Sequence, residues 1–218
     1  MSLRSFWKIS LVFVFAVLTG CATSRSEIRI PEPGVAIAAQ PATGKTVVIR
    51  SVEDERVFEQ APSDPSIPSL GFGGADQAQA DIKSRAIGRK RNAYGKALGD
   101  ILLQNGQTVE SVVRENLTAA LLQAGYQVKT GTSDTADYIV DAHIKKFWAW
   151  MQPGFWALSL KTNIETDLNI SGKSVPTNIS VHVEDNRQVA TESAWTEIIG
   201  KGLQEYRNQV VTKSKDMN

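Results

Sequence analysis

The sequence predicts an α+β domain in which one antiparallel sheet of about four strands carries two helices packed on one face. Residues 138–150 and 156–170 alternate apolar and polar side chains, as half-buried antiparallel strands do. Residues 108–124 and 193–213 place apolar side chains at three- and four-residue spacing, as amphipathic helices do. Because no second block of core size is present, we expect a single domain over residues 45–213.

The other elements follow along the chain. Residues 45–52 are rich in β-branched side chains and predict the first strand. Residues 53–93 lack periodicity and are punctuated by proline and glycine, which predicts a long irregular loop that is either functional or partly disordered. Residues 97–103 fit a short strand, 126–129 a short edge strand, and 178–183 a further alternating strand.

Both helices have recognisable ends. Thr108 can cap the first helix, and Gly125 suits its termination. The second helix is followed by a polar tail over residues 214–218.

The two long strands predict a hairpin whose turn is the three-residue loop 152–154. This turn pairs Trp150 with Trp156, since residues directly opposite share a face of the sheet. Lys146 interrupts the alternation of its strand, which a nearby β-bulge would explain.

The aromatic stretch at this hairpin divides by parity into two faces. One face is expected to end the core and carries Trp148, Trp150 and Trp156. The opposite face, where the neighbouring strand residues are polar, carries Phe147, Met151 and Phe155. Exposed apolar side chains of this kind indicate a contact site, so we expect this hairpin tip to touch a membrane or a partner.

The first residues have the plan of a secretory signal peptide. A short head with Arg4 and Lys8 precedes an apolar run, 9–18, that is too short to span a membrane permanently. The residues after it, Leu18, Thr19, Gly20 and Cys21, resemble the lipobox of bacterial lipoproteins. That resemblance implies removal of residues 1–20 and acylation of Cys21, whereas the rival interpretation is an ordinary signal peptide with an incidental cysteine.

Removal of the leader takes the formal net charge from +1 to −1. Acylation would leave no thiol for a disulfide, a thiolate metal site or a nucleophile, because Cys21 is the only cysteine. The lipoprotein resemblance also implies sorting to the outer membrane with the domain in the periplasm, since Ala22, not Asp, follows the cysteine. That compartment excludes nucleic acid as a partner. Residues 21–44, small, polar and proline-punctuated, predict a flexible tether.

A basic segment lies within the predicted loop and just beyond it. Its six cations, with no acid between them, are Lys83, Arg85, Arg89, Lys90, Arg91 and Lys96. The segment is either a solvated loop or a contact for anionic lipid headgroups, cell-wall polymer or an acidic protein surface.

No catalytic constellation, metal site or cofactor site is predicted. His143 and His182 fall on polar faces of strands, where solvated side chains explain them better than a metal site does. The charges of Glu53, Asp54 and Glu55 are balanced by neighbouring arginines.

The whole plan resembles the YajG-like family of bacterial envelope lipoproteins. The segments that carry the resemblance are 18–21, 47–49, 121–128, 137–143 and the terminal helix. Membership implies a membrane-anchored lipoprotein and not an enzyme, although the loop 53–93 is longer than that family leads us to expect.

We therefore expect a non-enzymatic, outer-membrane-anchored periplasmic lipoprotein that serves as an adaptor or assembly module for an envelope protein partner. The alternative is a lipid- or small-ligand-binding accessory subunit of an envelope transport system, and an enzyme acting on the cell wall is a third class. A closed apolar pocket under the long loop would favour the accessory subunit. An open patch that joins the basic segment to the hairpin tip would favour the adaptor.

Overall fold

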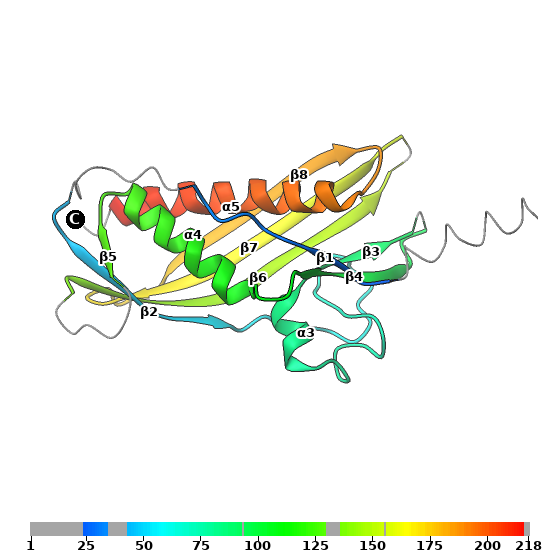
Figure 1. Ribbon diagram of the computed structural model, residues 1–218, viewed down its shortest axis with the longest axis horizontal. Coiled ribbons are helices and arrows are strands. Elements are labelled where there is room, and N and C mark those ends of the chain that lie inside the picture. The colour runs from blue at the N-terminus through cyan, green and yellow to red at the C-terminus, as the bar shows by residue number, and fades with distance from the viewer. Residues whose placement is uncertain (1–23, 35–42, 93, 130–135, 155, 216–218) are drawn as a thin grey trace, which may run out of the picture.

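The computed structural model describes residues 24–34, 43–92, 94–129, 136–154 and 156–215. Within them the chain forms eight strands and three helices (Figure 1). The strands are β1 (Ser26–Ile28), β2 (Thr46–Asp54), β3 (Ala86–Arg91), β4 (Ala97–Leu103), β5 (Gln127–Lys129), β6 (Tyr138–Pro153), β7 (Leu158–Ile170) and β8 (Thr177–Arg187). The helices are α3 (Ala80–Arg85), α4 (Val109–Gln123) and α5 (Glu192–Ser214).

The strands form one mixed sheet. The order β1-β4-β3-β6-β2-β5 is extended by β7 and β8 from the other edge of β6. The pairs β1–β4, β2–β5, β2–β6 and β3–β6 are parallel, and the pairs β3–β4, β6–β7 and β7–β8 are antiparallel. The prediction of one antiparallel sheet of about four strands with two helices is therefore wrong. Parallel partners come from segments far apart in the chain, and local periodicity does not reveal such pairing.

The strand β6 is long enough to pair with two strands along the same edge. β2 follows it as far as the pair Asp54–Ile144, and β3 joins it at the pair Gly88–Ala149. The chain between them, residues 55–87, leaves this edge and returns to it. The strands β2 and β3 thus act as two halves of one interrupted strand beside β6.

Arg56 bridges the interruption. Its side chain is fully buried, and its Nη1 donates to the carbonyl oxygens of Ala86 at 2.6 Å and Phe147 at 3.1 Å. Its Nη2 donates to the carbonyl oxygen of Lys83 at 2.8 Å, and its Nε and Nη2 each bond a carboxylate oxygen of Asp54 at 2.7 Å. One guanidinium therefore links the carboxylate of Asp54 at the end of β2 to backbone carbonyls of β6 and of the chain entering β3, where buried carbonyls need partners.

The helices α4 and α5 cover one face of the sheet (Figure 1), and both predicted helices are confirmed. Thr108 Oγ1 accepts a hydrogen bond from Ser111 N at 3.1 Å, and Ser111 Oγ accepts one from Thr108 N at 3.0 Å, which fixes the start of α4. Gly125 ends the helix in a left-handed conformation with a φ of 91°. Thr191 caps α5 by accepting from Ala194 N at 3.2 Å. No helix of the described residues is both long and apolar enough to cross a bilayer.

The main core fills the space between these helices and the sheet. Its large, fully buried members include Leu117, Tyr126, Ile144, Phe147, Trp195 and Tyr206. Two tyrosine hydroxyls in this core find partners, as buried polar groups must. Tyr126 Oη donates to the Ser214 carbonyl at 2.8 Å, and Tyr206 Oη lies 3.2 Å from Thr166 Oγ1.

A β-bulge in β6 between Ile144 and Lys146 reverses the face of every later residue in the strand. The β6 side chains in the helix-side core are Val140, Ala142 and Ile144 before the bulge and Phe147, Ala149 and Met151 after it. Trp148 and Trp150 consequently lie on the face away from the helices. Lys146 was the sequence signal for this bulge, but parity carried across it assigned the faces wrongly.

A smaller second core covers Trp148 and Trp150. The indole Nε1 of Trp148 donates to the Pro65 carbonyl at 3.1 Å. Its ring packs edge to face against the Phe58 ring, with the ring centres 6.1 Å apart. The covering chain is residues 55–79 together with α3. The predicted irregular loop 53–93 therefore also contains the end of β2, α3 and β3.

The prediction of a flexible tether over residues 21–44 is wrong for part of that range. β1 pairs with β4 through Ser26–Ile101 to Ile28–Leu103. Ile28 and Ile30 are buried, and the Gln107 side chain both donates to and accepts from the backbone of Ile30. The sheet therefore holds the chain within a few residues of Cys21, which itself lies outside the described residues together with the lipobox.

The predicted hairpin turn over residues 152–154 is also wrong. β6 and β7 pair through Met151–Leu160 and Pro153–Leu158, so the connecting loop is 154–157. Trp150 pairs with Lys161 and not with Trp156.

Candidate functional site

The candidate site is the place where β3 and β6 separate. The two strands pair only at Gly88–Ala149 and Arg89–Trp150. At Gly88 a Cβ atom would lie 2.6 Å from the Ala149 carbonyl oxygen, so glycine permits the close approach. Beyond these two pairs β3 turns away with β4, while β6 continues along β7 to Pro153.

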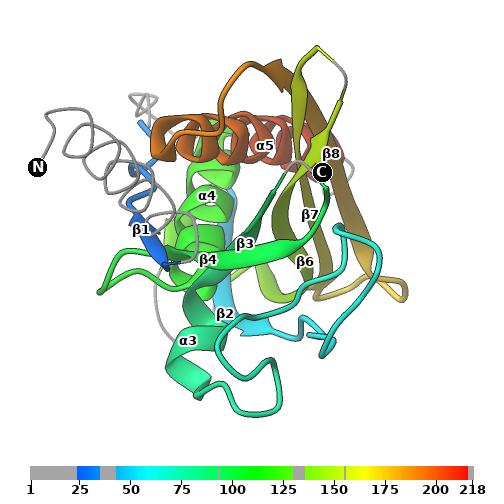
Figure 2. The same ribbon diagram turned by 90° about the vertical axis from the view of Figure 1, so that its right-hand side faces the viewer.

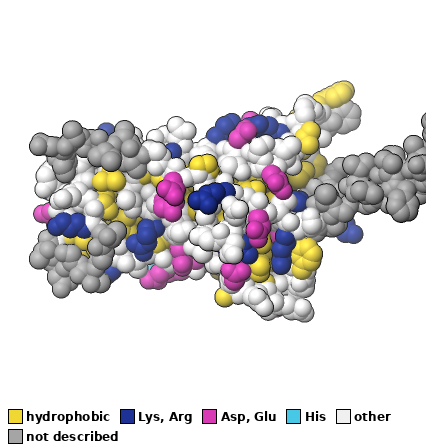
Figure 3. All heavy atoms as spheres, viewed as in Figure 1, with side chains coloured by type: hydrophobic (Ala, Val, Ile, Leu, Met, Phe, Trp, Pro, Cys, Tyr) yellow, Lys and Arg dark blue, Asp and Glu magenta, His cyan; other side chains and the backbone are white. Residues whose placement is uncertain are grey.

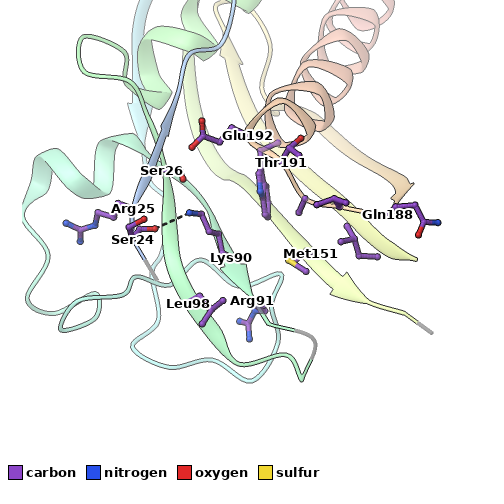
Figure 4. A pocket seen from close by; sticks show the side chains of 14 residues that line it. Ser24, Arg25, Ser26, Lys90, Arg91, Leu98, Met151, Gln188, Thr191 and Glu192 are labelled. Atoms are coloured by element: carbon purple, nitrogen blue, oxygen red, sulfur yellow. Dashed lines mark hydrogen bonds between the residues drawn. The ribbon is translucent and has the colours of Figure 1, made fainter. Parts of the chain in front are cut away.

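An open cleft of about 590 Å³ lies between the diverging strands and the start of α5 (Figure 4). The side chains that line it come from β1 and the residues just before it, from β3, β4, β6 and β7, and from the β8–α5 connection and the start of α5. They include Arg25, Lys90, Arg91, Leu98, Met151, Leu158, Val189, Glu192 and Trp195. We call this space the cleft.

The cleft combines cationic and apolar surfaces. Lys90 Nζ donates to the Ser24 carbonyl at 3.1 Å, and Arg91 Nη1 donates to the Gly95 carbonyl at 2.8 Å. Arg91 Nε is buried and has no hydrogen-bond partner among the described residues. Burial, reinforced by the like charge of Arg89, lowers the pKa of Arg91. An acceptor group entering here would satisfy a buried donor.

A second hollow of about 470 Å³ lies on the other face of the sheet, beside the same split. Arg91 and Met151 line both hollows, and Trp150 and His182 line only the second. The separation of β3 from β6 is thus accessible from both faces.

The basic segment does not form one surface. Arg85 is buried, bonds the Leu103 carbonyl at 3.0 Å and pairs with Glu27 at 3.0 Å. Arg89 bonds the Leu98 carbonyl at 3.2 Å and lies 3.8 Å from the buried carboxylate of Asp100. Their acidic partners, Glu27 and Asp81 for Arg85 and Asp100 for Arg89, lie outside residues 83–96, which is why the segment itself looked uncompensated.

The remaining cations of the segment are dispersed. Lys90 and Arg91 line the cleft, Lys96 is exposed in the β3–β4 turn, and Lys83 lies on α3. In the view of Figure 3, positive and negative side chains are interspersed over the surface.

The aromatic hairpin tip is arranged almost opposite to its prediction. Phe147 is fully buried and Met151 is 9% exposed, so neither is part of an exposed tip, and Phe155 lies outside the described residues. Trp148 and Trp150 are buried as predicted, although in the second core. Trp156, predicted in the core, is 84% exposed. The bulge explains why Phe147 and Met151 lie on the helix side of the sheet and Trp148 and Trp150 on the other side. The longer turn explains the exposure of Trp156.

The two histidines do not meet. His143 pairs with Asp167 across β6 and β7, whereas His182 pairs with Asn163 across β7 and β8. Each bonds its own asparagine: His143 Nε2 lies 3.0 Å from Asn169, and His182 Nδ1 lies 2.6 Å from Asn163.

His143 instead joins Glu53 and Glu55 in a cluster whose potential ligand atoms all lie within 4.8 Å of one another. The Lys145 ammonium bonds Glu55, and this contact, followed by that of His143, lowers the pKa of Glu55. A cation at this exposed position would have to displace Lys145, so the cluster is better described as an ion-pair network.

Several cleft residues were not singled out in the sequence. Trp195 and Glu192 belong to α5, Leu98 to β4 and Arg25 to the segment expected to be a tether. Only the tertiary arrangement brings them together. The available signal was Gly88, a glycine inside a strand, which indicates close backbone approach.

No protein-family model and no curated protein matches the chain. Among solved structures, it is similar to an uncharacterized protein with 9% identity, covering 90% of this chain and 99% of that one, with a TM-score of 0.47. The chain is also similar to a Xanthomonas campestris protein of family DUF330, with 10% identity and a TM-score of 0.47. The match covers 88% of this chain and 96% of that protein. A third similar structure is a putative neuraminyllactose-binding hemagglutinin homolog from Helicobacter pylori, with 10% identity and a TM-score of 0.38. The match covers 88% of this chain and 92% of that protein. None of the three carries the YajG-like resemblance, which stays a prediction.

Proposed function

We propose that the chain is an outer-membrane-anchored periplasmic lipoprotein that acts as a non-enzymatic adaptor in the cell envelope. The observation that carries the adaptor role is the open cleft, which joins Lys90 and Arg91 of the basic segment to Met151 and Leu158 of the hairpin. An open surface of this kind is what distinguishes an adaptor from a protein that encloses its ligand.

The occupant that fits the cleft is an extended segment of a partner protein that carries apolar side chains and a carboxylate. Residues 151–153 of β6 have no ladder partner on the cleft edge within the described residues, so a partner backbone can bond there. Leu98 and Trp195 offer apolar contact, and Arg91 offers a buried donor to a carboxylate.

A photo-reactive amino acid at Gln188, on the exposed rim of the cleft, tests this docking in intact cells. We expect a protein adduct that Val189→Asp abolishes, because a carboxylate on the cleft wall would repel an acidic segment. The matched control is Val175→Asp, since Val175 is 71% exposed in the β7–β8 turn and Val189 is 65% exposed. An adduct that persists with Val189→Asp, or no adduct at all, would contradict the proposal.

The membrane anchor is proposed from the lipobox and is tested separately. Wild-type protein should incorporate radiolabelled palmitate and fractionate with outer membranes, and Cys21→Ala should do neither. A processed, membrane-bound Cys21→Ala protein would refute acylation as the anchor.

A second candidate is a lipid- or small-ligand-binding accessory subunit of an envelope transport system. One observation favours it: about 590 Å³ is a volume in the usual range of small-ligand pockets. Native mass spectrometry of the purified protein would then show a retained molecule that Val189→Asp releases. Protein capture at Gln188 without such a molecule would favour the adaptor.

A further inference from the structure

The attachment of β1 to the sheet determines which end of the domain lies near its anchor. Cys21 is three residues from Ser24, and three residues span at most about 11 Å. Ser24 is held by Lys90, and two residues later β1 pairs with β4. If Cys21 is acylated, as the proposed function has it, the bilayer lies beside this end of the domain.

Three turns or loops surround this end, and Figure 2 looks onto it. They are the β3–β4 turn, the β6–β7 turn and the loop that contains Phe72. Phe72 is placed there by Arg25, whose guanidinium carbon lies 4.6 Å from the centre of its ring. The β3–β4 and β6–β7 turns extend from the two strands that border the cleft.

Each of the three carries a strongly exposed aromatic side chain. Tyr94 in the β3–β4 turn is 96% exposed, Trp156 in the β6–β7 turn 84% and Phe72 62%. The other strongly exposed large apolar side chains of the described residues are Val57, Val175 and Val189, and none of these is aromatic. Every such aromatic therefore lies at the end from which the chain runs to Cys21.

Cations lie at this end, interspersed with the acids Asp64, Asp185 and Glu192. Lys96 is exposed two residues after Tyr94, while Arg25, Lys90 and Arg91 lie along the neighbouring cleft. Tyrosine and tryptophan are favoured at the boundary between lipid and water, and lysine and arginine are attracted to anionic headgroups. The two preferences coincide at one end of the molecule.

We propose that this end, marked by Phe72, Tyr94 and Trp156, docks on the bilayer surface, with the aromatic side chains at the headgroup level and the exposed Lys96 against anionic lipids. The acyl anchor and the aromatic contacts together then fix the orientation of the domain. The cleft opens beside the membrane, and a partner would reach it there and not from the far end.

The far end supplies the control. The β7–β8 turn lies at the opposite end of β7 from the β6–β7 turn, and the 13 residues of β7 span about 40 Å. Val175 in that turn is 71% exposed, so it is comparable in accessibility to the aromatic positions.

The test uses the full-length, lipidated protein with a single introduced thiol, at Tyr94→Cys, Trp156→Cys or Val175→Cys, labelled with a nitroxide. Because Cys21 is the only native cysteine and would be acylated, only the new thiol reacts. Each protein is reconstituted into vesicles of phosphatidylethanolamine and phosphatidylglycerol. Collision rates with oxygen, which concentrates in lipid, and with a water-soluble nickel chelate are then measured by electron paramagnetic resonance.

We expect the ratio of oxygen to nickel collisions to be several-fold higher at positions 94 and 156 than at 175. Equal, water-like ratios at all three positions would overturn the proposal. Failure of the anchor itself is distinguishable, because unacylated protein would not float with the vesicles in a density gradient. Unchanged thermal melting of each labelled variant confirms that the substitution has not unfolded the domain.

Discussion

Arg56 offers the sharpest test of how the sheet is held together beside the cleft. In Arg56→Ala the side chain that spans the gap between β2 and β3 is removed. The Asp54 carboxylate, 14% exposed, loses its partner, and the carbonyl oxygens of Ala86 and Phe147 lose their donor. Because β3 begins to pair with β6 two residues after Ala86, the change weakens one wall of the cleft.

The expected loss follows from the burial of the pair. Removing one partner of a buried ion pair costs roughly 3–5 kcal/mol, since the remaining charge stays buried without compensation. Urea lowers the free energy of unfolding of small proteins by about 2 kcal/mol per molar. A loss of about 4 kcal/mol therefore lowers the midpoint by about 2 M.

Urea titration followed by tryptophan fluorescence measures this loss. Trp148 packs on Phe58, whose ring lies 5.2 Å from the Arg56 guanidinium carbon, so its emission reports on the affected region. The control is Arg50→Ala, which removes an ion pair with Asp141 whose arginine is 57% exposed. Exposed pairs contribute about 0–1 kcal/mol. If Arg56→Ala lowered the midpoint no more than Arg50→Ala, the bridging role argued for Arg56 would be refuted.

Three further predictions concern the core and its packing. Gly88→Ala would place a Cβ 2.6 Å from the Ala149 carbonyl oxygen of β6 and should cost about 1–3 kcal/mol of stability, measured by thermal melting. The control is Gly200→Ala in α5, where the space is open, and it should stabilise the protein by about 0.5–1 kcal/mol. Equal changes in melting temperature would contradict the close approach of β3 and β6. Trp148→Ala should cost about 3–5 kcal/mol and the exposed Trp156→Ala less than about 0.5 kcal/mol in urea, and similarly large losses at both positions would restore the predicted placement of both in the core. Burial raises the pKa of Tyr206 to about 12, so the unfolded chain loses this proton near pH 10 while the folded chain keeps it. Stability should therefore fall by about 1.4 kcal/mol per pH unit between pH 10 and about 12, and Tyr206→Phe should show a shallower fall than the parent.

Local sequence patterns identified many of the elements and little of their arrangement. The α4 and α5 helices follow from apolar spacing, and the start of α4 also from its capping residue Thr108, which acts within one turn. The long strands β6 and β7 follow from alternation, which is likewise local. The lipobox at residues 18–21 is a local signal too, and its consequence for localisation stays a prediction.

The tertiary structure decided how these elements pair and which side chains reach the surface. A single bulge near Lys146 moved Phe147 and Met151 into the helix-side core, because one extra residue reverses every later face of a strand. The parallel pairing of β2 and β3 with β6 joins residues about 60 to 90 positions apart, which no local period encodes.

The cleft depends on the same long-range pairing. It exists because β3 approaches β6 at Gly88 and then diverges, and because the residues after β8 bring the start of α5 against the opening. The sequence by itself determined the helices and the long strands, whose signals lie within a few neighbouring residues. The sheet order, the exposure of Trp156 and the cleft were decided only by folding, because each depends on contacts between distant segments.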